Sequence, residues 1–271
     1  MLTREIMGAL ALSILWLNAG LVIAVALKQL GRLRRLGARA RLAAERGELV
    51  EGLVRRADGE AFAVRRVHQL GRSLRAGREA ILFTDGRQSF EVLGGEIETA
   101  QGTLTVPAAD AARSEVWHEP ARGQAAVEAD PVAYDEALAA AGTYKGYAHD
   151  IEVPIREGER VFVWGARRDD ELVPDEDAPL LVSTIDPRAF VASRVRLLAL
   201  FVLGALVTLI GVTALAVWPP RFELVSTIGG ALGLAYFLAI QPLGTAVRDA
   251  VKTPARRLIN GEWRRPPSPL L

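Results

Sequence analysis

The stretch at residues 197–218, LLALFVLGALVTLIGVTALAVW, carries no charge. At about 1.5 Å of rise per residue, a helix of this length spans the roughly 30 Å hydrocarbon core of a bilayer. Two further apolar runs, Ile6 to Leu27 and Leu224 to about Val247, predict two more spans. We therefore expect an α+β membrane protein with three transmembrane helices. The polar remainder should form one β-rich soluble domain, a small sandwich or OB-like barrel with a short helix.

These runs also predict how the chain is divided. In order, we expect a first anchor at 1–27, a basic juxtamembrane helix at 28–46, the β-rich domain at 47–186, a connecting helix and second span at 187–218, a third span at 224–247, and a basic, proline-ended tail at 248–271. Asp186-Pro187 supplies an N-cap and a first helical residue, so the connecting helix should run unbroken into the second span. The domain is thus expected to lie directly against the bilayer, without a flexible linker.

Basic residues follow the first span and the third span, on the side where the domain lies. They are Lys28, Arg32, Arg34, Arg35, Arg39, Arg41, Arg248, Lys252, Arg256 and Arg257. Because positively charged segments stay in the cytoplasm, the bias predicts an outside N-terminus with the domain and C-terminus in the cytoplasm. The Ala- and Arg-rich composition is typical of a bacterium with a GC-rich genome, which favours a multi-pass protein of the cell membrane. For the basic residues between Leu27 and Arg46, we interpret the pattern as setting topology, with specific lipid recognition as the alternative.

Polar and small residues inside the spans predict how the helices pack. Asn18 is expected to form an interhelical hydrogen bond worth about 1 kcal/mol rather than to take part in transport. Gly229 and Gly233 have the spacing that allows close helix approach, and we expect the second span to pack there through Gly204 or Gly211.

Within the domain, alternating residues separated by turn signals predict a meander of short strands. Asp-Gly between alternating runs favours a two-residue hairpin turn, so we expect hairpins at Asp58-Gly59 and Asp85-Gly86. Further turns are expected at Gly94-Gly95 and Gln101-Gly102. Later strands are predicted at 114–119, 149–155, 160–168 and 180–184. Asp130-Pro131 predicts a helix that ends before Gly142.

The composition excludes several kinds of chemistry. Cysteine is absent, which rules out disulfides, thiolate zinc sites and cysteine nucleophiles. The net charge of +1 gives no global attraction for nucleic acid. No phosphate-binding, hydrolase or zinc-protease motif occurs, and no charge interrupts the spans. We predict no catalytic residue, no cofactor and no metal site.

The candidate site residues of the soluble domain are histidines and acidic residues. His118 lies beside Glu119 and His149 beside Asp150, but neighbours on a strand point to opposite faces, so we predict surface histidines. The acidic segment 169–177 is predicted to be a solvated loop, because its spacing is not that of an EF-hand. Cation binding there is left open.

A set of turn and strand residues resembles a known family. The matching positions are Phe83, Asp85, Gly86, Glu152, Ile155, Gly158, Val161, Val163, Gly165 and Ser183. Together with the layout of spans, this pattern resembles the "beside a membrane" (BAM) domain of the E3 ubiquitin ligase family known as MULAN or GIDE, over roughly residues 48–218. The ligases carry a RING finger that needs Cys, and this chain has none. The resemblance therefore implies the membrane-proximal domain without ubiquitin transfer.

The leading functional hypothesis is a non-enzymatic, membrane-anchored sensor or binding protein. Its partners would be the lipid bilayer and an unidentified protein or small molecule, with no nucleic acid. A homo-oligomer is left open. The alternatives are a membrane scaffold or assembly protein with an OB-like domain, and a ligase-like homologue without ligase activity. A membrane-bound hydrolase has only scattered His and acidic residues in its favour.

Overall fold

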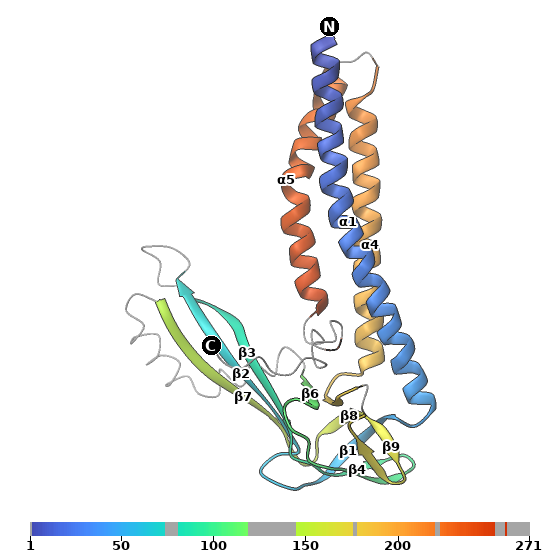
Figure 1. The fold of residues 1–271 in the computed structure, drawn as a ribbon, viewed down its shortest axis with the longest axis vertical. Helices are drawn as coiled ribbons and strands as arrows, with labels where there is room; N and C mark the ends of the chain where they lie inside the picture. The colour runs from blue at the N-terminus through green and yellow to red at the C-terminus, as the bar shows by residue number, and fades with distance from the viewer. Residues whose placement is uncertain are drawn as a thin grey trace. The chain divides into compact units, whose positions relative to one another are not determined.

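The computed structural model describes residues 2–73, 81–118, 145–175, 178–219, 223–252 and 258. The chain divides into two compact units (Figure 1). The helical unit comprises Met1–Ala38 and Arg188–Asn260, and the β unit contains Arg39–Pro187. The predicted helix from Asp130 to Gly142 and the tail residues Arg256 and Arg257 lie outside the described residues.

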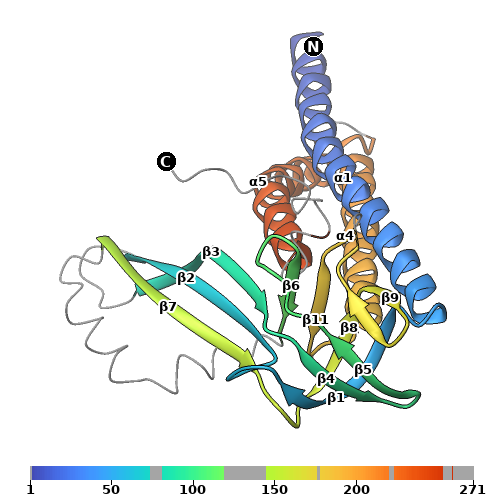
Figure 2. The same ribbon diagram turned by 60° about the horizontal axis from the view of Figure 1, so that its bottom comes forward.

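Three helices make up the described part of the helical unit. They are α1 (Leu2–Glu45), α4 (Pro187–Ala216) and α5 (Leu224–Lys252). All three are long and apolar enough to cross a membrane, as their sequence predicts. Figures 1 and 2 show them running side by side. Helix α4 continues without a break from Pro187 into the apolar run, and α1 continues without a break past Leu27, as expected.

Small residues let α5 approach α4 closely, but not where the sequence predicted. A Cβ atom added to Gly229 would lie 2.3 Å from the backbone nitrogen of Ala216, so the two helix backbones meet there. Gly204 and Gly211, the expected contact points, have nothing within 4 Å of such a Cβ. The prediction that Gly229 packs on the second span is confirmed, while the predicted partner residues are wrong. The close approach of the two helices is made by Gly229 of α5 against the last turn of α4.

The β unit contains two sheets. Its strands are β1 (Leu49–Ala57), β2 (Ala63–Ser73), β3 (Ile81–Val92), β4 (Gly95–Thr99), β5 (Gly102–Val106), β6 (Ser114–Trp117), β7 (Lys145–Ile155), β8 (Arg160–Trp164), β9 (Ala166–Arg168), β10 (Glu171–Val173) and β11 (Leu180–Ser183). The larger sheet has eight strands in the order β6-β11-β8-β1-β4-β5-β10-β9, and the smaller has the order β3-β2-β7. The larger sheet is mixed, because β10 is parallel to β5 and β11 is parallel to β6. Figure 2 shows the three long strands of the smaller sheet.

The two predicted Asp-Gly hairpins are wrong. Strand β1 pairs with β4 and β8, whereas β2 pairs with β3 and β7, so the segment around Asp58-Gly59 carries the chain from one sheet to the other. Phe62 accounts for this change of sheet, because it is fully buried and its backbone N–H donates to Ile155 O at 2.7 Å. A buried anchor on the second sheet outweighs the local preference for a hairpin turn.

The second Asp-Gly pair lies inside a strand. Asp85 is paired with Gln69 and Gln88 with Val67, so β3 has one more residue than β2 over this interval. This is a β-bulge, which glycine accommodates without reversing the chain. The ladder to β2 continues on both sides of the bulge and holds the segment extended.

Other turn predictions are confirmed. At Gly94 and Gly95 the φ angles are 91° and 142°, which favour glycine, and a Cβ on Gly95 would lie 2.0 Å from Arg56 O. Strands β4 and β5 form a hairpin in which Thr99 is paired with Gly102. The predicted strand 160–168 is divided into β8 and β9 at Gly165. The acidic segment 169–177 is not only a loop, because it contains β10 and the buried Leu172.

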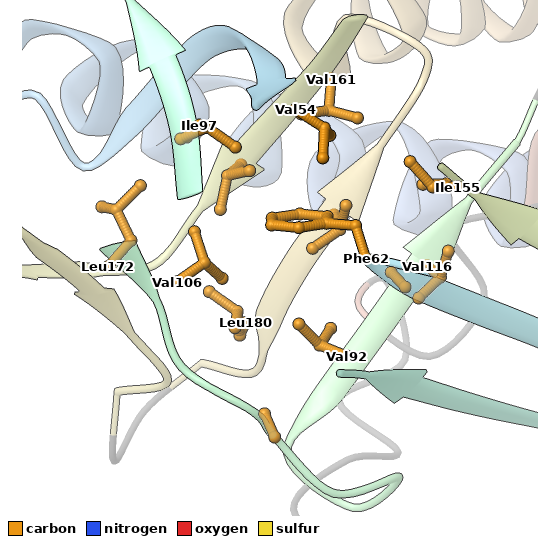
Figure 3. Close-up of a cluster of buried hydrophobic side chains, with 14 of the residues drawn as sticks. Val54, Phe62, Val92, Ile97, Val106, Val116, Ile155, Val161, Leu172 and Leu180 are labelled. Carbon is orange, nitrogen blue, oxygen red and sulfur yellow. The ribbon is translucent and has the colours of Figure 1, made fainter. Parts of the chain in front are cut away.

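One hydrophobic core joins the two sheets. Figure 3 shows the labelled side chains of this core converging around Phe62. Val161 and Val163 of β8 point into the core and are fully buried. Phe162 and Trp164, on the opposite face of the same strand, pack against a cluster formed by Ala40, Ala43 and Leu49. Successive residues of β8 thus alternate between the core and the opposite face of the sheet.

Candidate functional site

Side-chain hydrogen bonds connect the three apolar helices. The Gln241 amide donates to Asn18 Oδ1 at 2.6 Å, and Asn18 Nδ2 lies 3.4 Å from Phe237 O. Asn18 on α1 is therefore satisfied by two groups of α5. The predicted interhelical hydrogen bond of Asn18 is confirmed, because an amide in apolar surroundings must find a partner on a neighbouring helix.

The other two helix pairs are joined in the same way. Trp16 Nε1 on α1 donates to Thr213 Oγ1 on α4 at 3.0 Å. Tyr236 on α5 donates its hydroxyl proton to Ala205 O on α4 at 2.9 Å. Each pair of helices thus shares at least one side-chain hydrogen bond, which fixes the rotation of each helix about its axis.

A cavity of about 250 Å³ lies between the three helices near the basic ends of their apolar runs. Its polar lining consists of Gln29, Gln241, Thr245 and Arg248, and apolar residues of all three helices complete the wall. Gln29 is only 8% exposed, and its Oε1 accepts no hydrogen bond from the described residues. A buried amide oxygen without a donor costs free energy, so this cavity is a candidate binding site.

Of the predicted basic residues whose side chains the structure describes, only Arg248 lines this cavity. Arg248 lines it and is half-buried, with its Nε 3.3 Å from the Asp249 carboxylate. Lys28, Arg34 and Arg35 are exposed on α1, and Arg32 is half-buried. Arg39 and Arg41 belong to the β unit and are exposed. The backbone of Lys252 ends α5, and its side chain is outside the described part of the chain.

A second group of polar side chains is buried in the β unit at β6. His118 is 2% exposed, and its Nε2 lies 3.1 Å from Val153 O of β7. Ser114 is fully buried, and its Oγ lies 2.6 Å from Asp110 O and 3.1 Å from Phe90 O, within hydrogen-bonding distance of both. The prediction that His118 lies at the surface is wrong, because the smaller sheet covers β6. His149 and Asp150 lie in β7, and their side chains are outside the described set.

Glu115 is a buried carboxyl that no sequence pattern singled out. It is fully buried beside Trp117, whose Nε1 donates to Glu115 Oε1 at 3.4 Å. All four residues of β6 are buried, so the alternation that would mark an inward-facing carboxyl is missing. Ser114 and His118 contact backbone oxygens of other segments, whereas the described contact of Glu115 is with Trp117 of its own strand. The enclosure of Glu115 favours a structural role over contact with a ligand.

Exposed ion pairs lie on both sheets. Arg66 on β2 bridges Glu91 on β3 and Glu152 on β7, at 2.6 and 2.5 Å. Hydrogen bonds from its Nη1 to Glu91 and its Nε to Glu152 raise the pKa of Arg66. On the larger sheet, the hydrogen bond from Arg55 and its charge hold the pKa of Glu98 below its ordinary value.

The residues that carry the family resemblance have structural roles wherever their contacts are described. Gly158 has φ of 79° in the turn between β7 and β8, where a left-handed residue is needed. A Cβ on Gly165 would lie 2.7 Å from Val173 O. Ser183 is buried, donates to Ile185 O at 2.6 Å and accepts from Ile185 N at 3.0 Å, just before α4 begins.

The remaining matching residues lie in strands. Phe83, Asp85 and Gly86 lie within β3, and the burial of these three residues is not described. Glu152 forms the ion pair with Arg66, and Val163 is in the core.

The described residues contain no group of three or more His, Asp or Glu side chains that could hold a metal ion. No protein-family model, curated protein or solved structure matches this chain. The similarity to the BAM domain accordingly stays a prediction.

Proposed function

We propose that this chain is a non-enzymatic, multi-pass membrane protein that senses a ligand or partner at its β unit and passes that state to its membrane helices. The N-terminus lies outside, and the β unit and C-terminus lie in the cytoplasm. One observation carries the proposal. Helix α1 runs unbroken from Leu2 to Glu45, so its first part belongs to the helical unit and its last turns belong to the β unit.

The last turns of α1 are built into the β unit. Ala40 and Ala43 are buried and pack with Leu49 at the start of β1. Phe162 and Trp164 of β8 complete this cluster from the outer face of the larger sheet. Any rearrangement of β8 or β1 therefore changes the packing surface of α1 itself.

The second connection is equally short. Strand β11 ends at Ser183, whose side chain bonds both backbone groups of Ile185, and α4 begins at Pro187. A flexible Gly/Ser linker would absorb a motion of the domain, whereas a helix of many turns moves as a stiff element. Two stiff connections favour transmission over simple tethering.

Hydrogen–deuterium exchange of the full chain in nanodiscs tests this coupling. Phe62→Ala loosens the core of the β unit, and we expect faster exchange to extend along α1 into residues 28–38. A Gly/Ser insertion after Ala38, combined with one between Asp186 and Val195, should confine the faster exchange to the β unit. If Phe62→Ala leaves residues 28–38 unchanged in the uninterrupted chain, the proposed transmission is wrong.

A scaffold function is the second candidate, supported by the smaller sheet. Its outer strands in the described topology, β3 and β7, are long, and long edge strands are templates for pairing with another chain. Cross-linking in membranes separates the two functions. A constant partner or stable homo-oligomer favours a scaffold, and ligand-dependent contacts favour a sensor. A ligase-like homologue without ligase activity remains the third proposal, because the sequence contains no Cys for a RING.

A further inference from the structure

The cavity between the three helices has an unsatisfied polar atom at its wall. Gln29 is more than nine-tenths buried, it lines the cavity, and its Oε1 has no donor among the residues described. Burying such an oxygen without a partner costs about 1–3 kcal/mol. Oε1 has almost no accessible surface, so a ligand reaches it only when the Gln29 amide turns toward the cavity. An N–H or O–H donor of the ligand would then remove this cost.

Arg248 favours a ligand that carries negative charge. Its side chain lines the same cavity and carries a positive charge that Asp249, an exposed neighbour at 3.3 Å, only partly offsets. Lys28 precedes the cavity residue Gln29 in α1, and Arg194 precedes the cavity residue Leu198 by four positions in α4, so both add positive charge near this end of the cavity. An anionic group is therefore favoured, and a cationic ammonium group is disfavoured.

The rest of the wall is apolar. Leu21, Val22 and Val25 of α1 face the cavity together with Leu198 and Phe201 of α4. Gln29 and Arg248 lie just after the apolar runs that end near Leu27 and Val247, and Leu198 is the second residue of the apolar run of α4. The polar and apolar parts thus occur in the order of a phospholipid, with the head group at the basic end and the chain along the helices.

We propose that this cavity binds the head group of an anionic phospholipid that carries free hydroxyls, as phosphatidylglycerol does. Arg248 binds the phosphodiester, and the Gln29 amide turns its Oε1 toward the cavity to accept a hydrogen bond from a glycerol hydroxyl. The upper part of one acyl chain lies against Val25, Leu198 and Phe201. Basic pockets between membrane helices on the cytoplasmic side are suited to anionic head groups. This inference rests on the proposed placement of the helices in a membrane, and it gives the helical unit a specific lipid as its ligand.

Native mass spectrometry of the full chain, released from nanodiscs containing equal amounts of phosphatidylglycerol and phosphatidylcholine, tests the site. We expect the parent protein to retain phosphatidylglycerol preferentially. Arg248→Gln and Gln29→Leu should each lower that retention by about fivefold, in line with about 1 kcal/mol for one basic contact near the surface. Arg35→Gln removes the same charge from an exposed position on α1 outside the cavity, so it should leave the preference unchanged.

Three results would overturn the site: equal retention of the two lipids by the parent, a loss in Arg35→Gln as large as in Arg248→Gln, or full retention in both cavity variants. Soluble glycerol phosphate, added in excess, should not displace the lipid. Displacement would show that contact between the acyl chain and the apolar lining contributes nothing to the binding affinity. Far-UV circular dichroism of each variant identifies misfolding. Competition between the two lipids on the parent protein tests the preference for phosphatidylglycerol without any substitution. If the protein instead purifies from the cytosol without detergent, the membrane placement fails, which is a different outcome from unselective lipid binding.

Discussion

The side-chain amide of Gln241 donates a hydrogen bond to Asn18 Oδ1 at 2.6 Å and thereby joins α5 to α1. Both residues lie within long apolar helices, where an unpaired amide would be costly. Gln241 also lines the cavity that contains Gln29 and Arg248, so the same contact shapes one wall of the proposed lipid site.

Removing Asn18 should weaken the association of α1 with α5. Asn18→Leu keeps a similar volume but deletes both polar contacts and leaves the Gln241 amide without its acceptor. We expect a loss of about 1 kcal/mol in the unfolding free energy of the helical unit, measured by denaturant titration in mixed micelles. Ser13→Ala is the matched control, since the Ser13 hydroxyl bonds only Ala9 O of its own helix among the contacts observed. An Asn18→Leu protein as stable as the parent would contradict this role.

Two adjacent glycines of α5 should respond differently to the same substitution. A Cβ on Gly229 would enter the backbone of α4 at Ala216, whereas Gly230 has nothing within 4 Å of its Cβ position. We expect Gly229→Ala to destabilise the helical unit by about 1–3 kcal/mol, because the helices must separate or shift. Gly230→Ala should be neutral or slightly stabilising, since alanine is the better helix former. Thermal unfolding of both variants in one detergent gives the comparison, and equal effects would show that α4 and α5 do not meet at Gly229.

The core of the β unit should depend strongly on Phe62. This side chain is fully buried among residues of both sheets (Figure 3), and its backbone groups bond Ile155, Leu93 and Gly94. Phe62→Ala should cost about 3–5 kcal/mol of unfolding free energy through lost burial and the cavity left behind. Leu53→Ala is the control, because Leu53 is 44% exposed on β1. Urea titration followed by hydrogen exchange of β-unit peptides measures both, and a small effect of Phe62→Ala would contradict a shared core.

The pair formed by Arg55 and Glu98 should make stability depend on pH. Arg55 lowers the pKa of Glu98 below its ordinary value of 4.5, chiefly by its hydrogen bond at 2.9 Å. A lowered pKa in the folded state stabilises the fold above pH 4.5, and this contribution is lost as the pH falls through the folded value. Glu98→Gln should therefore reduce stability above that pH and have a shrinking effect below it. Both residues are exposed, so added salt should weaken the difference. An effect that grows on acidification would contradict the pairing.

The helices were predictable because their physical requirement is local and strong. A long uncharged run such as residues 197–218 has few stable alternatives to a buried or membrane helix. The need to satisfy Asn18 likewise predicted an interhelical hydrogen bond, although only the structure identifies Gln241 as the donor. The turns at Gly94-Gly95 and Gln101-Gly102 were predictable, because glycine readily adopts the positive φ angles that such turns need.

The sheet pairing could not be read from the same local signals. Asp58-Gly59 and Asp85-Gly86 have the chemistry of hairpin turns, but one lies in a crossing between sheets and the other at a bulge. Long-range contacts of Phe62 and the continuous ladder between β2 and β3 decided both outcomes. Burial of Glu115 and His118 also depends on the smaller sheet covering β6, and no pattern within residues 114–118 indicates it.

Labelling of introduced cysteines tests the central claim, the membrane topology, most directly. The natural sequence has no Cys, so a single introduced thiol is the only one to react. We choose Glu223→Cys, just before α5, and Glu60→Cys, at an exposed position of the β unit. With a membrane-impermeant maleimide on intact cells, the account predicts that position 223 reacts and that position 60 reacts only after lysis. Labelling of position 60 in intact cells, or protection of position 223, would contradict it.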